Sequence, residues 1–289
     1  MAPMLSIVSA AATYTHAGPL TSLAAHEARL LSLPESVAEL CAVVQGLLVH
    51  VYWDRAYGLV LSEERKQAVQ IRPAAAKLDA ILALDDRPLT VTRPPQLRLA
   101  ATCRDYSLLL TAFLRHQGVP ARARCGFATY FVPQHHEDHW VVEYWNPAET
   151  RWVLVDPQID EVQRAALNLT FDPLDVPRGR FLSGGAAWQR CRSGGADPDT
   201  FGIFEYKGMG FIRGNLIRDL AALNRVEMLP WDVWGLMLPP HELLTSNDVA
   251  LLDTIAHMTV GAAATPSADA VEALYACDAR LRPPDAWLA

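Results

Sequence analysis

Three residues in one short stretch have the types and the order needed for cysteine chemistry. Cys103 lies in the segment TCRDY, His139 lies in EDHW, and Asp156 directly follows the apolar run WVLV. A thiolate is the reactive form of cysteine, so a nucleophilic cysteine needs a nearby base, and a histidine base is usually held in one tautomer by a third group. The pattern predicts a cysteine nucleophile, a general base and an orienting carboxylate.

Local signals predict that Cys103 begins a helix. Thr102 and Asp105 form a capping-box pattern, and apolar residues then recur at helical spacing. Gly118 and Pro120 mark the end, so the helix should run from about residue 103 to 117. At this position the helix dipole favours a thiolate, and the backbone N–H of Cys103 is one donor for an oxyanion. A small buried cysteine without chemistry is the alternative interpretation.

The two other residues fall on a predicted hairpin. Aromatic and β-branched content predicts strands at residues 121–131, 139–145 and 151–155, with a turn at 146–149. If Trp145 pairs with Thr150, then His139 and Asp156 become direct cross-strand neighbours on one face of the sheet. A carboxylate in that position can bond an imidazole nitrogen, whereas a slip of one residue would separate the two side chains.

These motifs together resemble the transglutaminase-like superfamily of papain-type cysteine enzymes. Over roughly residues 96–160 the chain is similar to that family in its helix-borne cysteine, its strand histidine followed by an aromatic residue, and its aspartate after the next strand. The resemblance implies acyl transfer through a thioester on Cys103, with His139 as base and acid, Asp156 as orienter and no cofactor. The matching segments are Cys103–Tyr106, Leu114–Arg122, Asp138–Trp140 and Trp152–Pro157.

The order of elements predicts an α+β fold, and the resemblance implies a papain-like core with the nucleophile helix packed on an antiparallel sheet. Helical periodicity is expected before the core at residues 34–53, 62–72 and 74–84, and after it at 246–258 and 267–281. The chain then divides into an N-terminal helical part of the same domain (1–95), the catalytic core (96–160), an irregular and Gly/aromatic-rich extension (161–238) and C-terminal helices (239–289).

Two stretches of the extension are expected to border the catalytic cleft. Residues 171–195 show little periodicity and predict irregular structure, while residues 201–238 combine glycines with aromatic residues, as ligand pockets do. An ordinary packed core is the alternative interpretation. For the charges in the second stretch, internal ion pairs such as Arg218 with Asp219 or Glu227 are the default expectation, and substrate recognition is the alternative.

Two further residues are candidates for substrate binding. Trp140 is expected to wall the acyl site, against the alternative that it only packs. Gln45, on the upstream helix, is a candidate for the second oxyanion donor, against a structural polar role.

A metal site is the competing chemistry for this region. His135, His136, Asp138 and His139 could join Cys103 around zinc, because histidine and cysteine bind that ion. On a strand, however, His135 and His139 would lie about 13 Å apart, too far for one tetrahedral ion. Solvated loop histidines are therefore the expected state, and no metal is expected.

Composition narrows the partners. The chain has 289 residues, 51% of them hydrophobic, and a formal net charge of -7, so we expect neither nucleic acid nor an anionic membrane as its partner. No segment keeps about 18 consecutive apolar residues, and the N-terminus lacks the basic residues of a secretory signal. The five cysteines show no paired spacing, which favours a reducing, cytoplasmic environment.

The leading functional expectation is an enzyme that attacks an amide or thioester carbonyl and passes the acyl group to an amine or water. Its substrate would be a small molecule, a peptide or a carrier-protein thioester. A cysteine peptidase or amidase is one alternative. A non-catalytic scaffold of the same fold is the other, although an intact set of Cys103, His139 and Asp156 disfavours it.

Overall fold

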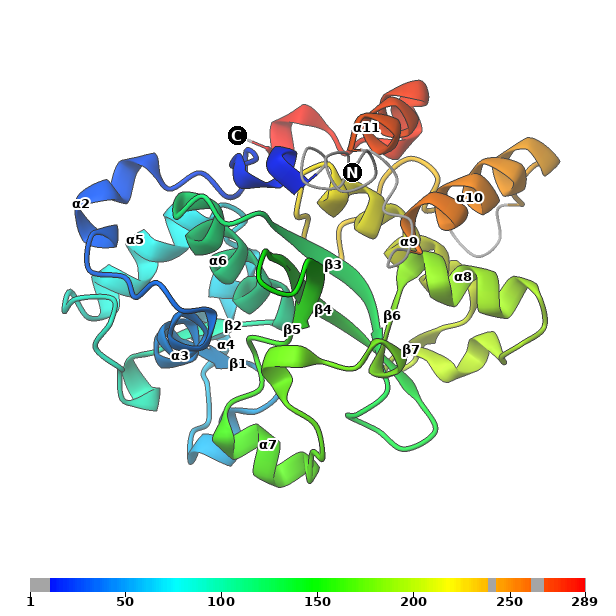
Figure 1. The fold of residues 1–289 in the computed structure, drawn as a ribbon. Helices are drawn as coiled ribbons and strands as arrows, with labels where there is room; N and C mark the ends of the chain where they lie inside the picture. The colour runs from blue at the N-terminus through cyan, green and yellow to red at the C-terminus, as the bar shows by residue number, and fades with distance from the viewer. Residues whose placement is uncertain (1–10, 239–242, 261–267, 289) are drawn as a thin grey trace.

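The computed structural model describes residues 11–238, 243–260 and 268–288, and it has the expected α+β architecture (Figure 1). The main sheet has the strand order β6-β3-β4-β7-β8, and β5 also pairs with β4. A second sheet consists of the parallel strands β1 (Leu48–His50) and β2 (Leu99–Ala101). The strands of the main sheet are β3 (Ala121–Ala128), β4 (His136–Asn146), β5 (Arg151–Val155), β6 (Phe181–Ser183), β7 (Phe201–Ile203) and β8 (Tyr206–Lys207).

The helices form two groups on either side of the main sheet. In Figure 1, α3, α5 and α6 lie together, while α8, α9 and α10 pack on one another near β6 and β7. The described α-helices are α2 (Glu27–Leu30), α3 (Val37–Leu47), α4 (Glu63–Lys66), α5 (Ala74–Leu84), α6 (Cys103–His116), α7 (Glu161–Leu167), α8 (Gly184–Arg192), α9 (Met209–Leu223), α10 (Ser246–Thr259) and α11 (Ala268–Cys277).

Helix α6 begins at Cys103, as its capping signals predict. The carboxylate of Asp105 accepts the backbone N–H of Thr102 at 2.9 Å, which fixes the first turn. Asp105 is fully buried and pairs with Lys77 of α5 at 3.0 Å, so the start of α6 is tied to a neighbouring helix. This anchoring holds Cys103 in a defined place.

The predicted strands pair in a register that differs from the expected one. Trp145 lies opposite Trp152, not Thr150, so the turn is displaced by one residue and the pairing by two. Because side chains alternate with a period of two, His139 and Asp156 stay on one face, but they are no longer direct neighbours across the ladder. The ladder ends at Val142 and Val155, and the chain diverges from β4 after that point.

This divergence exposes one edge of β4 to the nucleophile helix. On that edge β5 pairs with residues 142–146 and β7 pairs with residues 136–137. Among the described residues, no strand pairs with the same edge at residues 138–141, although β3 covers the opposite edge. The unpaired stretch contains His139 and leaves room for another group to meet the strand backbone.

Three elements differ from the sequence-based expectations. The helix predicted over residues 34–53 ends at Leu47 and is followed by strand β1. Residues 171–195, expected to be irregular, contain β6 and α8. The Gly/aromatic-rich stretch contains α9, which is buried along nearly its whole length. A helix buried on all sides has no polar face, so the periodicity of its residues does not reveal it.

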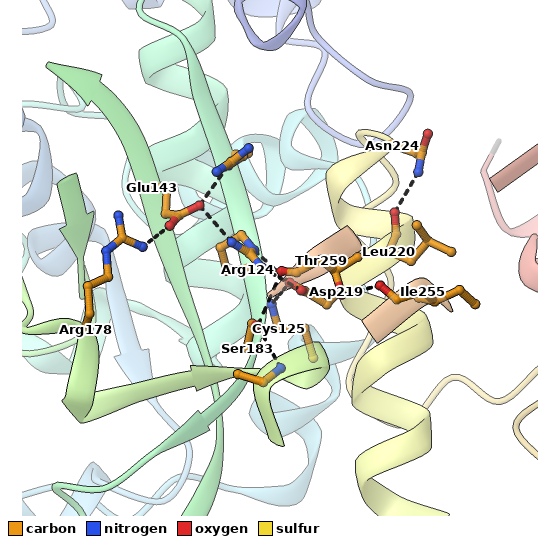
Figure 2. A network of polar contacts seen from close by, with 12 residues as sticks. Arg124, Cys125, Glu143, Arg178, Ser183, Asp219, Leu220, Asn224, Ile255 and Thr259 are labelled. Atoms are coloured by element: carbon orange, nitrogen blue, oxygen red, sulfur yellow. Dashed lines mark hydrogen bonds and ion pairs between the residues drawn. The ribbon is translucent and has the colours of Figure 1, made fainter. Parts of the chain in front are cut away.

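An ion-pair network joins the sheet to α9 (Figure 2). Glu143 of β4 accepts hydrogen bonds from Arg122 at 2.8 Å, from Arg124 at 2.9 Å and from Arg178. Arg124 also forms two bonds to Asp219 of α9, at 2.9 and 2.8 Å. All but Arg178 are almost completely buried. The network ties α9 and the segment around Arg178 to β3 and β4.

The expected ion pairs of Arg218 are therefore wrong. Asp219 pairs with Arg124, and Glu227 pairs with Arg115 at 2.9 Å. Arg218 instead donates to the side chain of Asn215 and to the backbone of Asp232. Apart from Arg218 and Asn215, the members of each pair lie far from each other in the sequence, so residue spacing alone does not identify the pairs.

One large hydrophobic cluster joins the N-terminal, central and C-terminal parts of the described chain. Its buried members come from the N-terminal segment, α3, α5, α6, the main sheet, α9 and α10, and they extend from Ala11 to Leu281. Within the described ranges, no helix is both long and apolar enough to cross a membrane.

Candidate active site

Cys103 lies against the unpaired edge of β4. Its side chain packs with Ala123, Cys125, Trp140 and Ala222 and keeps 8% of its surface exposed. A hydrogen bond from the backbone of Trp140 reaches the sulfur. Because Trp140 directly follows His139, this contact places the nucleophile candidate beside the histidine candidate.

His139 and Asp156 are in direct contact. The Nε2 atom of His139 lies 2.8 Å from Oδ2 of Asp156, and both side chains are buried. The same oxygen accepts the hydroxyl of Tyr130 at 2.6 Å, while Oδ1 accepts the backbone N–H of Gln158 at 3.0 Å. The carboxylate is thus fixed by three donors, and it holds the Nε2 proton of the imidazole.

Tyr130 belongs to this site, and sequence reasoning missed it. It lies in the loop between β3 and β4, and its ring packs edge-on against His139 with centroids 5.9 Å apart. Phe131 covers the same imidazole at 4.8 Å. The aromatic run Tyr130–Phe131 lies at the end of the predicted strand over residues 121–131, but β3 ends at Ala128, and the turn that brings these rings to His139 is not visible in the sequence.

The Cys103 thiol and the His139 imidazole are not hydrogen-bonded to each other in this structure. In the described part of the chain, no hydrogen bond joins Cys103 to His139, and Nδ1 of His139 has no hydrogen-bond partner. With its Nε2 proton directed at Asp156, the ring presents Nδ1 as a free acceptor. Catalytic hydrogen bonds are often loose before substrate binds, and this geometry has that character.

The electrostatic environment of Cys103 differs from the expectation of a stabilised thiolate. Burial raises the pKa of its thiol well above the usual value, and the nearby carboxylate of Asp138 raises it further. The hydrogen bond from the Trp140 backbone acts in the opposite direction but is smaller. Burial and Asp138 therefore both disfavour the thiolate form of Cys103.

Asp138 is a second buried carboxyl group beside the nucleophile. It accepts the side-chain amide of Asn215 at 2.7 Å, and Arg218 of the same helix contributes a stabilising charge. Burial nevertheless raises the pKa of Asp138. Helix α9 thus contacts Asp138 through Asn215. These interactions explain two of the polar residues in the Gly/aromatic-rich stretch, Asn215 and Arg218.

The two substrate-binding candidates have other positions. Trp140 is completely buried behind Cys103 and has no exposed surface for a substrate, and its indole N–H has no partner among the described residues. Gln45 donates to the backbone oxygens of Pro157 at 3.2 Å and Ile159 at 3.1 Å. Both of its N–H groups are thereby used, so Gln45 fixes the segment after Asp156 and cannot serve as an oxyanion donor.

Two exposed aromatic side chains lie within electrostatic range of Cys103. Tyr52 and Phe204 are each more than 60% exposed, and their rings meet edge-on at 5.1 Å. Phe204 is in the tight turn between β7 and β8 and has a positive φ of 52°. A charge on Cys103 would raise the pKa of Tyr52, so this pair is within electrostatic range of the nucleophile. The β7–β8 hairpin therefore borders the site.

The histidines proposed as alternative metal ligands are engaged in different contacts. His135 lies 3.2 Å from the backbone oxygen of Gly202, and His136 stacks on Phe201 at 3.9 Å. Both contacts connect the start of β4 with β7. They give these two histidines structural roles.

Comparison with known proteins agrees with this geometry. Residues 85–157 match the family model of the transglutaminase-like superfamily, and this range contains Cys103, His139 and Asp156. The α+β fold is consistent with a transglutaminase-like core, and that superfamily generally comprises cysteine enzymes that transfer or hydrolyse acyl groups. Searches of curated proteins and of solved structures found no match.

Proposed function

We propose that this protein is a cysteine acyltransferase or amidohydrolase that works through a thioester on Cys103. The observation that carries the proposal is the contact between His139 and Asp156 at 2.8 Å beside a cysteine at the first position of a helix. An oriented imidazole with one free ring nitrogen, near a thiol, is what this chemistry needs. The acyl donor is an amide or thioester of a small molecule, peptide or carrier protein.

In the first half-reaction, Nδ1 of His139 takes the proton from the Cys103 thiol as the sulfur attacks the carbonyl carbon. The C–S bond forms, and the carbonyl π electrons move to oxygen, where the backbone N–H of Cys103 stabilises the oxyanion. The tetrahedral intermediate collapses, the bond to the leaving amine or thiol breaks, and His139 returns its proton to that group. Asp156 stabilises the imidazolium without taking its proton.

In the second half-reaction, an amine or water loses a proton to Nδ1 of His139 and attacks the thioester carbon. Collapse of the second intermediate breaks the C–S bond, and the proton returns to sulfur. This sequence suits the raised pKa of Cys103, because His139 removes the proton only during attack and no resting thiolate is needed. In this mechanism His139 deprotonates Cys103 during attack, as a general base deprotonates a serine nucleophile, and the two residues do not rest as a thiolate–imidazolium ion pair.

Acylation of the intact protein tests the proposal. We expect one acyl group per molecule, on Cys103, after incubation with p-nitrophenyl acetate or an acyl thioester, measured by intact-protein and peptide mass spectrometry. The experiment uses a Cys277→Ser background, because Cys277 is exposed and would react on access alone. No adduct on Cys103 with any of these activated acyl donors would exclude the thioester mechanism.

Tyr130→Phe is expected to slow acylation without preventing it. The change removes one of three donors to Asp156, so the carboxylate is held less firmly while its bond to His139 remains. Loss of a supporting hydrogen bond of this kind typically costs about 10-fold or more in rate, so we expect roughly a 10-fold decrease in kcat with little change in KM. Asp156→Asn, which disturbs the imidazole tautomer directly, should cost clearly more; equal effects would contradict a positioning role for Tyr130.

A further inference from the structure

An acyl-transfer site needs more than one hydrogen-bond donor for the oxyanion. Removing a single donor from such a hole typically lowers the rate by about 10²–10³-fold. Here the backbone N–H of Cys103 can supply one donor, and Gln45 supplies none because its amide is committed to two backbone oxygens. Another donor must lie close to the nucleophile.

His50 lies near the start of α6. It is the last residue of β1 and lies opposite Ala101, the last residue of β2, two positions before Cys103. The backbone N–H of Val51 donates to Ala101 at 2.9 Å, which ties the two strand ends together. The imidazole of His50 stacks near Tyr106, on the first turn of α6, with ring centroids 6.5 Å apart. The fold therefore brings His50 beside the N-terminus of the nucleophile helix.

His50 is also close to the other site residues. The charges of His139, Asp105 and Asp156 all act on its imidazole, so it lies within electrostatic range of the His139–Asp156 pair and of the first turn of α6. Its side chain is buried, with 7% of the residue exposed. Burial, assisted by the charge of His139, lowers the pKa of His50 to about 3. The ring is therefore neutral under ordinary conditions.

The hydrogen bonds of His50 determine where its proton lies. Its Nδ1 accepts the backbone N–H of Tyr52 at 3.2 Å, so in a neutral ring the proton must be on Nε2. Within the described ranges, Nε2 has no hydrogen-bond partner in the protein. The Nε2 atom is not fully enclosed, so its N–H faces space that a ligand oxygen can reach.

We propose that the Nε2–H group of His50 is the second oxyanion donor, acting with the backbone N–H of Cys103 on the tetrahedral intermediate. This inference rests on the proposed function and adds a catalytic residue to it. Tyr52 has a supporting role, since its backbone N–H fixes the tautomer that presents the donor. The indole N–H of Trp140, also without a partner, is the competing donor. Its ring is enclosed in the apolar cluster behind Cys103, whereas His50 keeps some exposure.

Two reactions of the same sulfur separate this role from a structural one. Acylation by p-nitrophenyl acetate passes through an oxyanion, whereas alkylation by iodoacetamide displaces iodide at a saturated carbon and forms none. In a Cys277→Ser background, His50→Phe should lower the acylation rate about 10²–10³-fold and leave the alkylation rate of Cys103 within about 3-fold. His116→Phe, an exposed histidine at the far end of α6, is the matched control and should change neither rate.

Conservative variants keep the test decisive if the phenylalanine variant does not fold. His50→Asn can still accept the Tyr52 N–H but lacks a donor at the Nε2 position, so it should lose acylation as the phenylalanine variant does. His50→Gln can place an amide N–H near that position and should recover at least about 10-fold of the loss.

Three outcomes overturn the proposal. Unchanged acylation in His50→Asn would exclude His50 as a donor, and the oxyanion role would pass to Trp140 if Trp140→Phe then lost acylation. An equal loss of acylation and alkylation would give His50 a structural role only. A wild-type protein that is alkylated at Cys103 but never acylated would remove the proposed function itself, and the oxyanion role of His50 with it.

Discussion

Cys103→Ala is expected to abolish acylation and turnover while the protein remains folded. Without the sulfur no thioester can form, and loss of a nucleophile from a site of this kind lowers kcat by roughly 10⁶-fold, so activity should fall below detection. The structural cost should be small, because the change deletes one sulfur atom from a small buried cluster. Turnover assays and urea unfolding of the same preparation give both quantities.

Cys125→Ala is the matched control for this substitution. Cys125 belongs to the same buried cluster, lies opposite Trp140 across the β3–β4 ladder and is fully buried. It should cost at least as much stability as Cys103→Ala while leaving turnover within a few-fold of the wild type. Full turnover in Cys103→Ala would refute the thioester mechanism, and equal losses in both variants would indicate that the cluster acts only through packing.

The parts of this site that could be predicted from the sequence are those with local causes. The start of α6 is fixed by Thr102 and Asp105, and its end by Gly118, all within a few residues of the helix. The β4–β5 hairpin joins strands that are adjacent in the chain, so its strands were also predictable. Its register was not, because Thr150 adopts a positive φ of 52° and the turn covers residues 147–150. The side-chain alternation kept His139 and Asp156 together despite this error.

The residues that sequence reasoning missed depend on contacts between distant segments. His50 reaches the site through a parallel pairing of three residues between β1 and β2, a pairing that no hairpin signal announces. Tyr130 reaches Asp156 across 26 residues of chain. The residue type and helical position of Gln45 suggest an oxyanion donor, and only the positions of Pro157 and Ile159 show where its amide is used.

The raised pKa of Cys103 also depends on contacts between segments that are distant in the sequence. The position of the cysteine at a helix N-terminus is a local property, and it favours a thiolate. Burial by Trp140 and Ala222, and the proximity of Asp138, are tertiary properties, and both raise the pKa of the thiol. The sequence therefore predicts the local tendency at this cysteine, but not the effect of its tertiary surroundings on its pKa.

Glu143→Gln is expected to be the most destabilising conservative substitution in the sheet. Glu143 neutralises Arg122 and Arg124 inside the protein and Arg178 at its edge, as Figure 2 shows for the last two. The amide keeps the shape but not the charge, so Arg122 and Arg178 would lose their carboxylate partner and only Arg124 would keep one, Asp219. Removing one partner of a buried ion pair typically costs about 3–5 kcal/mol, and we expect a loss of that size in the free energy of unfolding at pH 7.

The pH dependence of this loss follows from the direction of the pKa shift. The surrounding arginines hold the pKa of Glu143 well below its usual value near 4.5, despite burial. A depressed carboxyl pKa contributes stability that is fully present above the unfolded value and is lost as the pH falls toward the folded one. The difference between wild type and Glu143→Gln should therefore be constant from pH 5 to 7 and narrow by about 2 kcal/mol by pH 3, measured by urea unfolding.

Glu149→Gln is the control that separates burial from charge pairing. Glu149 also pairs with an arginine, Arg151, but about half of its side chain is exposed, and exposed pairs contribute only about 0–1 kcal/mol. Its loss should be small at every pH. If Glu143→Gln were as mild as Glu149→Gln, the three arginines would have to be solvated or neutralised by other groups, and the network would not be what attaches α9 to the sheet. A large loss confined to Glu143→Gln would instead show that the charges near the catalytic sheet are held in place by this one buried carboxylate.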